Sequence, residues 1–277
     1  MNETTLKKAV SIEGIGLHTG RNISIKLRPS PANSGINFIR VDLPNKPLIN
    51  VQSLDLERLN TKERRTVVSS GDVEVHTVEH LMAALAALSV DNIIIEVDNM
   101  ELPGLDGSAK GFFDALKSAG VKEYDSPKKT IRIKDPAWVE DADSFLGIFP
   151  AKELRISYIL SYKSPRALGG FYDIVVDEKN FEREIAPART FCFEEEALAL
   201  LKKGLGKGAN YDNTLVIGEN GPVKNAFRFD DEPVRHKILD LIGDLYVLGC
   251  RLEGRVVAIK SGHRLNMELV RKLKGKR

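Results

Sequence analysis

The segment PVRHKILDLIGDLYVLG, residues 233–249, constrains this chain more than any other stretch of it. Its isoleucines and leucines occupy one broad arc of a helical wheel, as in a helix that is buried over most of its surface. On the remaining edge, His236, Lys237, Asp240 and Asp244 line up. A solvated face would mix charges more loosely, so this edge is predicted to face a site.

A His-x3-Asp pair places two ligands one turn apart on one helical edge, where they can chelate a single cation. A surface ion pair is the simpler interpretation of His236 and Asp240. The motif TVEH supplies a second histidine, His80, preceded by Glu79. Adjacent helical residues diverge by about 100°, so Glu79 is better placed to take a proton from water than to bind the same ion. His80, His236 and Asp240 would leave a coordination position open, as catalytic metal sites do.

Composition sets the broad class of the protein. The 277 residues allow one large domain or two ordinary ones, and 42% hydrophobic residues are enough for a core. A net charge of +2 does not favour a nucleic-acid partner.

The two cysteines form no CxxC pair, which fits a reducing compartment. The first residues lack the apolar region of a signal peptide, and the longest apolar run, residues 81–90, is too short for a bilayer. A soluble intracellular protein is expected.

The order of the predicted elements repeats along the chain. Each repeat has a helix, a strand and a second helix, at 78–89, 92–97 and 109–120 and again at 233–249, 255–260 and 266–274. Thr77 is predicted to cap the first helix. The charged segment 122–129, which contains a proline, is predicted to mark the domain boundary. This order indicates two similar α+β halves that pack helix against helix, with His80 and His236 near their shared face.

Three residues outside these helices are weaker candidates. His263 lies in SGHRLN, on a predicted loop before the last helix, where a capping or surface histidine is the alternative. Thr190 offers a hydroxyl donor at a strand end in ARTFCF, beside Phe191, and could also be ordinary strand sequence.

Two glycine-rich stretches are candidates for loops that contact a ligand. GLGKG, residues 204–208, lacks the frame of a P-loop and suggests only a turn that lets the backbone approach a ligand. GIGLHTG places His18 between glycines, as a substrate contact, a spare metal ligand or part of a plain turn. His76 precedes the predicted cap Thr77 and is expected to point away from the metal.

Several motifs occur together in a characteristic order: TVEHLMAALAAL, PGLDGSA, ARTFCF, GLGKG, NTLV, EPVRHKILDLIGDLYVLG and SGHRLN. This ordered set closely resembles the UDP-3-O-acyl-N-acetylglucosamine deacetylases, zinc amidases of lipid A (lipopolysaccharide) biosynthesis in Gram-negative bacteria. The resemblance covers nearly the whole chain, from about residue 6 to residue 273. It implies hydrolysis of the N-acetyl group to acetate and a free amine, the committed step of that pathway.

The resemblance also implies the fold. Residues 1–124 and 128–277 would form two α+β halves, each a β-sheet with two helices, packed as a β-α-α-β sandwich with the active site at the interface. The first half would carry an insert near 45–65 and the second an insert near 160–178. The second insert would help to form the apolar passage for the substrate's acyl chain.

The resemblance implies a catalytic Zn²⁺ held by His80, His236 and Asp240, in agreement with the spacing. Two imidazoles and a carboxylate also suit Fe²⁺. Glu79 would be the general base. His76 stands where the family usually has another residue, and could bind a second, inhibitory metal.

Further roles follow from the same resemblance. His263 would be the protonated group that donates a proton to the leaving amine, with Asp244 orienting it. Thr190 and Lys237 would stabilise the oxyanion or bind substrate, and Phe191 would line the acyl side. A glycine commonly precedes Gly262 in the family, whereas this chain has serine, a change that should leave His263 in place.

Gly208 and His18 complete the expected substrate contacts. The enzyme is expected to be a cytoplasmic monomer that binds a small molecule, with no nucleic-acid partner and no integral membrane segment. Two rival interpretations stay open: a different metal-dependent amidase or esterase, and a protein whose metal is purely structural.

Overall fold

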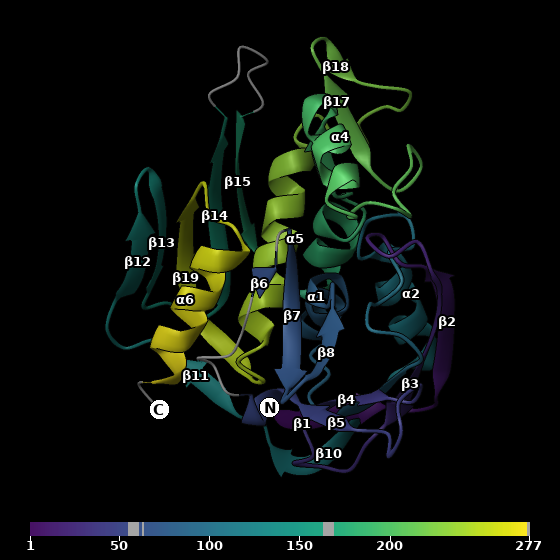
Figure 1. Ribbon diagram of the computed structural model, residues 1–277. Helices are drawn as coiled ribbons and strands as arrows, with labels where there is room; N and C mark the ends of the chain where they lie inside the picture. Colours follow the sequence, from purple (N-terminus) through teal and green to yellow (C-terminus); the bar gives the residue numbers. More distant parts are fainter. Residues whose placement is uncertain (55–60, 63, 163–168, 276–277) are drawn as a thin grey trace.

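The computed structural model describes residues 1–54, 61–62, 64–162 and 169–275 (Figure 1). Within these ranges the protein is α+β, with helices and several separate sheets. None of the helices in the described part is long and apolar enough to cross a membrane.

The first large sheet has the strand order β2-β3-β9-β4-β5. Its strands are β2 (Val10–Ile15), β3 (Asn22–Pro29), β9 (Ile93–Val97), β4 (Ile36–Arg40) and β5 (Leu48–Asn50). Buried and more exposed residues alternate along β3, so that one face of the strand points into the core. Ile23, Ile25 and Leu27 lie on this buried face, and the residues between them are more exposed. Strand β4 pairs in parallel with β9, and the other pairs are antiparallel. The β-branched sequence IIIEV thus forms the central strand.

Helices α1 (Glu79–Ala87) and α2 (Lys110–Ala119) lie beside this sheet; they contact each other, and α2 also contacts β2. The buried face of α2 carries Phe112, Phe113 and Leu116, and the helix ends at Gly120, whose φ of 70° suits glycine. Strand β1 (Asn2–Leu6) pairs with β10 (Val121–Pro127) beside the sheet. Most of the segment 122–129, predicted to mark the domain boundary, thus lies in strand β10, which long-range pairing with the N-terminus stabilises.

The second large sheet has the order β12-β13-β19-β14-β15, with β11 also pairing with β19. Its strands are β11 (Thr130–Arg132), β12 (Ala137–Asp141), β13 (Ser144–Phe149), β14 (Leu154–Ser161), β15 (Gly169–Val175) and β19 (Arg251–Ile259). Helix α5 (Glu232–Tyr246) contacts β14 and β15, and α6 (His263–Lys274) contacts β12 and β13. The expected helices at 233–249 and 266–274 are thus present with shifted ends.

Helices α1 and α5 pack against each other at the centre of the molecule (Figure 1). Gly243 permits this contact: a Cβ atom built on it would lie 2.0 Å from the backbone oxygen of Glu79. The buried residues on both sides of this crossing belong to one hydrophobic cluster. The close approach brings the N-terminal turn of α1 next to the polar edge of α5.

Smaller elements surround this crossing. Strands β6 (Thr61–Lys62), β7 (Arg65–Ser70) and β8 (Val73–His76) form one small sheet, and β16 (Phe191–Phe193), β17 (Leu215–Gly218) and β18 (Gly221–Pro222) form another. The remaining helical segments are α4 (Glu194–Lys202), α3 (Glu178–Asn180), η1 (Val51–Ser53) and η2 (Phe181–Ile185). Parts of both expected inserts, residues 55–60 with 63 and residues 163–168, lie outside the described residues.

Candidate active site

The start of α1 differs from the sequence prediction in a way that matters for the site. Thr77 does not cap the helix; Val78 occupies the N-cap position, and its side chain makes no capping bond. Thr77 instead adopts a φ of +58°, which is rare for a β-branched residue. Its backbone N–H donates to the Thr66 carbonyl at 2.9 Å, and its hydroxyl donates to Glu101 at 3.3 Å. These contacts fix the turn that leads directly into Glu79 and His80.

His80, His236 and Asp240 come together at the crossing of α1 and α5. One ligand atom from each lies within 4.8 Å of the other two, and all three side chains are buried. The Nε2 atoms of His80 and His236 lie 3.7 Å and 3.4 Å from Oδ1 of Asp240. Within the described ranges this is the one group of three such residues that could hold a metal ion. Two imidazole nitrogens and a carboxylate form a donor set that suits Zn²⁺ or Fe²⁺.

The surroundings keep these groups in the protonation states that a cation requires. Burial, assisted by neighbouring His236, lowers the pKa of His80 to about 3, so its imidazole is neutral. His236 Nδ1 lies 3.0 Å from the Ala188 carbonyl, a contact that assigns the proton to Nδ1 and leaves Nε2 as a ligand. Burial opposes ionisation of Asp240, but its interactions with His236 and with the ammonium of Lys237 outweigh it and hold the pKa of Asp240 far below its usual range.

Glu79 is buried beside this group, and its carboxylate accepts a backbone N–H from Thr66 at 3.1 Å. Burial raises the pKa of Glu79 to about 8, against the opposing charge of His263. A carboxyl group with a raised pKa can both accept and return a proton near neutral pH.

His263 is the first residue of α6, not part of the preceding loop as predicted. Its Nδ1 lies 2.8 Å from Oδ2 of Asp244, and its Nε2 lies 3.9 Å from Oδ2 of Asp240. Burial lowers the pKa of His263, but Asp244 and Asp240 more than compensate and raise it to about 9. The side chain is therefore a cation at neutral pH.

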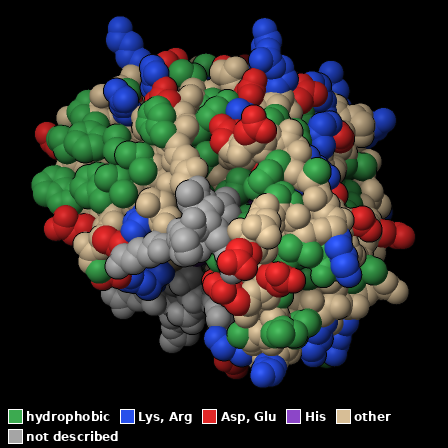
Figure 2. All heavy atoms as spheres, turned by 90° about the horizontal axis from the view of Figure 1, so that it is seen from above, with side chains coloured by type: hydrophobic (Ala, Val, Ile, Leu, Met, Phe, Trp, Pro, Cys, Tyr) green, Lys and Arg blue, Asp and Glu red, His purple; other side chains and the backbone are tan. Residues whose placement is uncertain are grey.

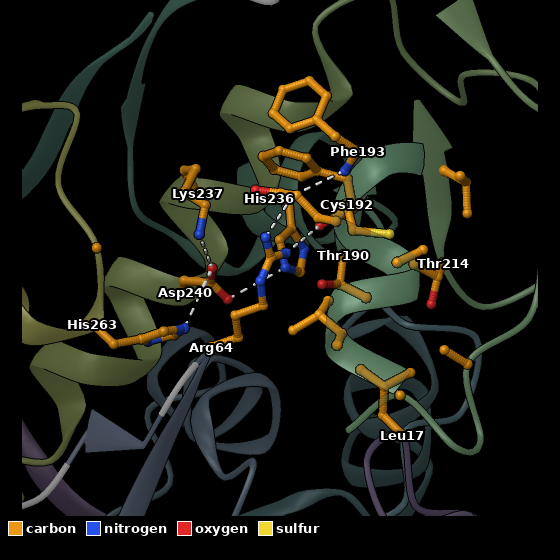
Figure 3. Close-up of a pocket in the computed structure, with 18 of the residues that line it drawn as sticks. Leu17, Arg64, Thr190, Cys192, Phe193, Thr214, His236, Lys237, Asp240 and His263 are labelled. Atoms are coloured by element: carbon orange, nitrogen blue, oxygen red, sulfur yellow. Dashed lines mark hydrogen bonds and ion pairs between the residues drawn. The ribbon is translucent and has the colours of Figure 1, made fainter. Parts of the chain in front are cut away.

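Thr190, Phe191 and Lys237 all line the same cavity. Lys237 donates to Oδ2 of Asp240 at 2.8 Å, and its Nζ lies 5.8 Å from the centre of the Phe191 ring. Figure 3 shows Lys237, Asp240 and His263 pointing toward one another, with Thr190 on the opposite side of the cavity.

The cavity has a volume of about 510 Å³ and two chemically different regions. The polar region holds the buried groups described above. Apolar side chains from β16, β17, α4 and the His18 loop line the other region: Leu17, Phe191, Phe193, Ala197, Leu200, Leu201 and Val216. Figure 2 views the end of the molecule that carries α4, where hydrophobic side chains lie among charges of both signs. On α4, Leu198 and Leu201 are exposed.

Two glycine-rich loops meet beside the cavity. His18 lines it, and no described residue hydrogen-bonds to its buried Nδ1. Burial lowers the pKa of His18 to about 4. Gly208 itself does not line the cavity; it donates its N–H to the Leu17 carbonyl at 3.1 Å, and a Cβ atom on it would lie 2.3 Å from the carbonyl oxygen of Gly16. Gly208 therefore joins the two loops.

His76 lies apart from the group that could hold a metal. Its Nε2 is 2.7 Å from a carboxylate oxygen of Glu74, and its Nδ1 is 3.4 Å from Nε of Arg65. His76 is the last residue of β8.

Sequence reasoning missed several residues that support the site. Thr66 and Asn266 hydrogen-bond to Asp244, and Arg64 lines the cavity and pairs with Glu196 at 2.6 Å. No local spacing signals them, because each reaches its partner from a distant part of the chain.

Comparison with known proteins agrees with these observations. Residues 3–275 match the family model LpxC, UDP-3-O-acyl N-acetylglycosamine deacetylase. A protein named UDP-3-O-acyl-N-acetylglucosamine deacetylase from Teredinibacter turnerae is 41% identical over 276 residues, covering 99% of this chain and 90% of that protein. Proteins of the same name from Myxococcus xanthus and Geobacter sp. are each 40% identical; the alignments cover 98% of this chain and 86% and 88% of those proteins. The resemblance read from the motifs is confirmed: the chain belongs to the UDP-3-O-acyl N-acetylglycosamine deacetylase family.

Proposed function

We propose that this protein hydrolyses the N-acetyl group of a UDP-3-O-acyl-N-acetylglucosamine, giving acetate and a free amine in lipid A biosynthesis. The match to the deacetylase family covers nearly the whole chain, and this membership supports the reaction. The observation that carries it is the combination, in one cavity, of a group that could hold a metal, a buried glutamate, a cationic histidine and an apolar region.

His80, His236 and Asp240 are the proposed ligands of the catalytic ion, with Zn²⁺ favoured and Fe²⁺ as the alternative. The converging neutral imidazoles and the ionised carboxylate fit such an ion. When bound, the ion would polarise the acetamide carbonyl and make a water molecule more acidic.

Glu79 is the proposed general base. Its carboxylate removes a proton from the attacking water, and the amide of Thr66 holds it in place. Burial keeps its pKa high enough for this transfer to be favourable near neutral pH.

His263 is the proposed general acid. Its Nδ1 is held by Asp244, so Nε2 faces the reacting group and can protonate the departing amine. The negative charge of Asp244 keeps the imidazole protonated until that step.

Thr190 and Lys237 are proposed to stabilise the negative charge that develops on the acetyl oxygen, through a hydroxyl and an ammonium that reach the cavity. Phe191 and the apolar lining would accept the acyl chain. His18 would contact the substrate through its ring, and Gly208 would act through the loop contact that it makes with Leu17.

At the scale of the whole chain, we propose that residues 1–124 and 128–277 are two halves of a β-α-α-β sandwich. The association of α1 with α2, of α5 with α6, and of α1 with α5 supports this arrangement. We also propose that the enzyme works as a cytoplasmic monomer; light scattering on the purified protein tests the oligomeric state.

Acetate release tests the substrate assignment. The protein should hydrolyse UDP-3-O-acyl-N-acetylglucosamine and act far more slowly on UDP-N-acetylglucosamine, which has no acyl chain to fill the apolar region. Equal turnover of both compounds would contradict the role of that region. Turnover of unrelated acetamides, with neither UDP-sugar cleaved, would favour a different metal-dependent amidase.

A further inference from the structure

Strand β7 contributes one fully buried polar residue to the site, Thr66. It lies between two groups that come from different helices: Glu79 at the start of α1 and Asp244 on α5. The roles proposed above use only its amide, which holds Glu79, and leave its side chain without a role.

The backbone of Thr66 holds Glu79, the proposed proton acceptor, in place. Its N–H donates to Oε2 of Glu79 at 3.1 Å, and its carbonyl accepts the N–H of Thr77 at 2.9 Å. The two bonds connect β7 to the strained turn before α1 and to the carboxylate that follows it. Glu79 is therefore oriented by a neighbouring strand as well as by its own helix.

The side-chain hydroxyl of Thr66 binds Asp244. It donates to Oδ1 of Asp244 at 2.5 Å, and the hydroxyl oxygen of Thr66 also lies 3.1 Å from Nδ1 of His263. The second carboxylate oxygen, Oδ2, receives bonds from His263 and Asn266, each at 2.8 Å. Asp244 is fully buried, so each of its oxygens needs a donor. In the part of the chain that the structure describes, Thr66 is the residue that donates to Oδ1.

We propose that Thr66 is a positioning residue that sets Glu79 and the Asp244–His263 pair at a fixed separation across the contact between α1 and α5. This inference rests on the proposed function, in which Glu79 accepts a proton and His263 donates one. Both groups must reach the same acetamide, so a small change in their separation lowers the rate of the chemical step. The β-branched side chain of threonine restricts χ1 and holds the hydroxyl on Asp244.

The test compares three single variants by steady-state kinetics. Thr66→Val keeps the amide and the shape but removes the hydroxyl; kcat should fall by about 10- to 100-fold with KM changed by less than about twofold. Thr66→Ser restores the hydroxyl and should recover most of kcat. Thr5→Val is the matched control, because Thr5 is buried, does not line the cavity and donates its hydroxyl to the backbone carbonyl of Asn92 at 2.7 Å. The control should keep wild-type kcat even where its melting temperature falls.

A double-mutant cycle separates positioning from general destabilisation. In an Asp244→Ala background, Thr66→Val should cost less than about twofold in kcat, because its partner has already gone. An undiminished loss in that background, or a Thr66→Val enzyme as active as the wild type, would overturn the proposal.

A spectroscopic measurement decides the question without turnover. The imidazole Nδ1–H proton resonance of His263 should move in Thr66→Val, return in Thr66→Ser and stay in place in Thr5→Val. If the wild type releases no acetate, the proposed function fails, yet this resonance still tests Thr66. An unchanged resonance in Thr66→Val would refute the positioning role.

Discussion

Replacing Gly243 by alanine tests how far the site depends on the contact between α1 and α5. A Cβ atom at this position would lie 2.0 Å from the carbonyl oxygen of Glu79, 2.7 Å from its carbonyl carbon and 3.0 Å from its Cα. These are backbone atoms, so no side-chain rotation relieves the overlap. The helices must separate by about 1 Å to bring the shortest contact from 2.0 Å back to 3.0 Å.

Two opposing effects determine the size of the change in stability. Alanine favours the helix over glycine by about 1 kcal/mol. Overpacking costs about 1–3 kcal/mol, and a clash with rigid backbone belongs at the upper end of that range. The net loss should be about 1–2 kcal/mol, which corresponds to roughly 2–8 °C in melting temperature. The effect on catalysis should be larger, because α1 carries His80 while α5 carries His236 and Asp240; a shift of about 1 Å can cost on the order of 100-fold.

Thermal unfolding and acetate release measure the two effects separately. Gly111→Ala on α2 is the matched control, because its new Cβ meets only the flexible end of Leu105, at 2.8 Å. That variant should keep activity and be as stable as the wild type or slightly more so. If Gly243→Ala matched the wild type in both assays, the argument from the helix contact would be refuted.

Three further predictions concern the base, a loop contact and pH. Glu79→Gln should lower kcat by about 100- to 10,000-fold without loss of bound metal, and should abolish the acidic limb of the pH–rate profile; an unchanged limb would exclude Glu79 as the base. Gly208→Ala should push its loop away from the Gly16 carbonyl and raise KM more than it lowers kcat, as initial-rate kinetics would reveal. Burial raises the pKa of Glu232, but hydrogen bonds from Arg189 outweigh this and hold it below the usual 4.5. Its stabilising contribution is therefore complete above about pH 4.5 and is lost as pH falls through the folded pKa; Glu232→Gln should cost about 3 kcal/mol at pH 7 and progressively less as the pH falls through that lowered pKa, as denaturant melts would show.

Residues that share one helix were the most predictable part of the site. The separation of His236 and Asp240 follows from helical geometry alone, and their edge of α5 does carry the buried polar groups. The order of helices and strands around α1 and α5 could likewise be read from periodicity, with ends that moved by a few residues.

Interactions between distant segments were not predictable. Thr77 has the residue type of a helix cap, but a left-handed backbone and a bond to Glu101 override that preference. Residues 121–127 are charged and lack a clear pattern, and they form β10 because β1 pairs with them. Thr66 reaches Asp244 across 178 positions of sequence, a contact that no local motif encodes.

Metal removal and restoration would test the central claim most directly. The protein should stay folded after chelation, as judged by circular dichroism, and release no acetate from UDP-3-O-acyl-N-acetylglucosamine. One equivalent of Zn²⁺ should restore turnover to the wild type but not to an Asp240→Ala variant. Full activity in the chelated protein, or unfolding on chelation with no activity after Zn²⁺ returns, would contradict a catalytic metal held by His80, His236 and Asp240.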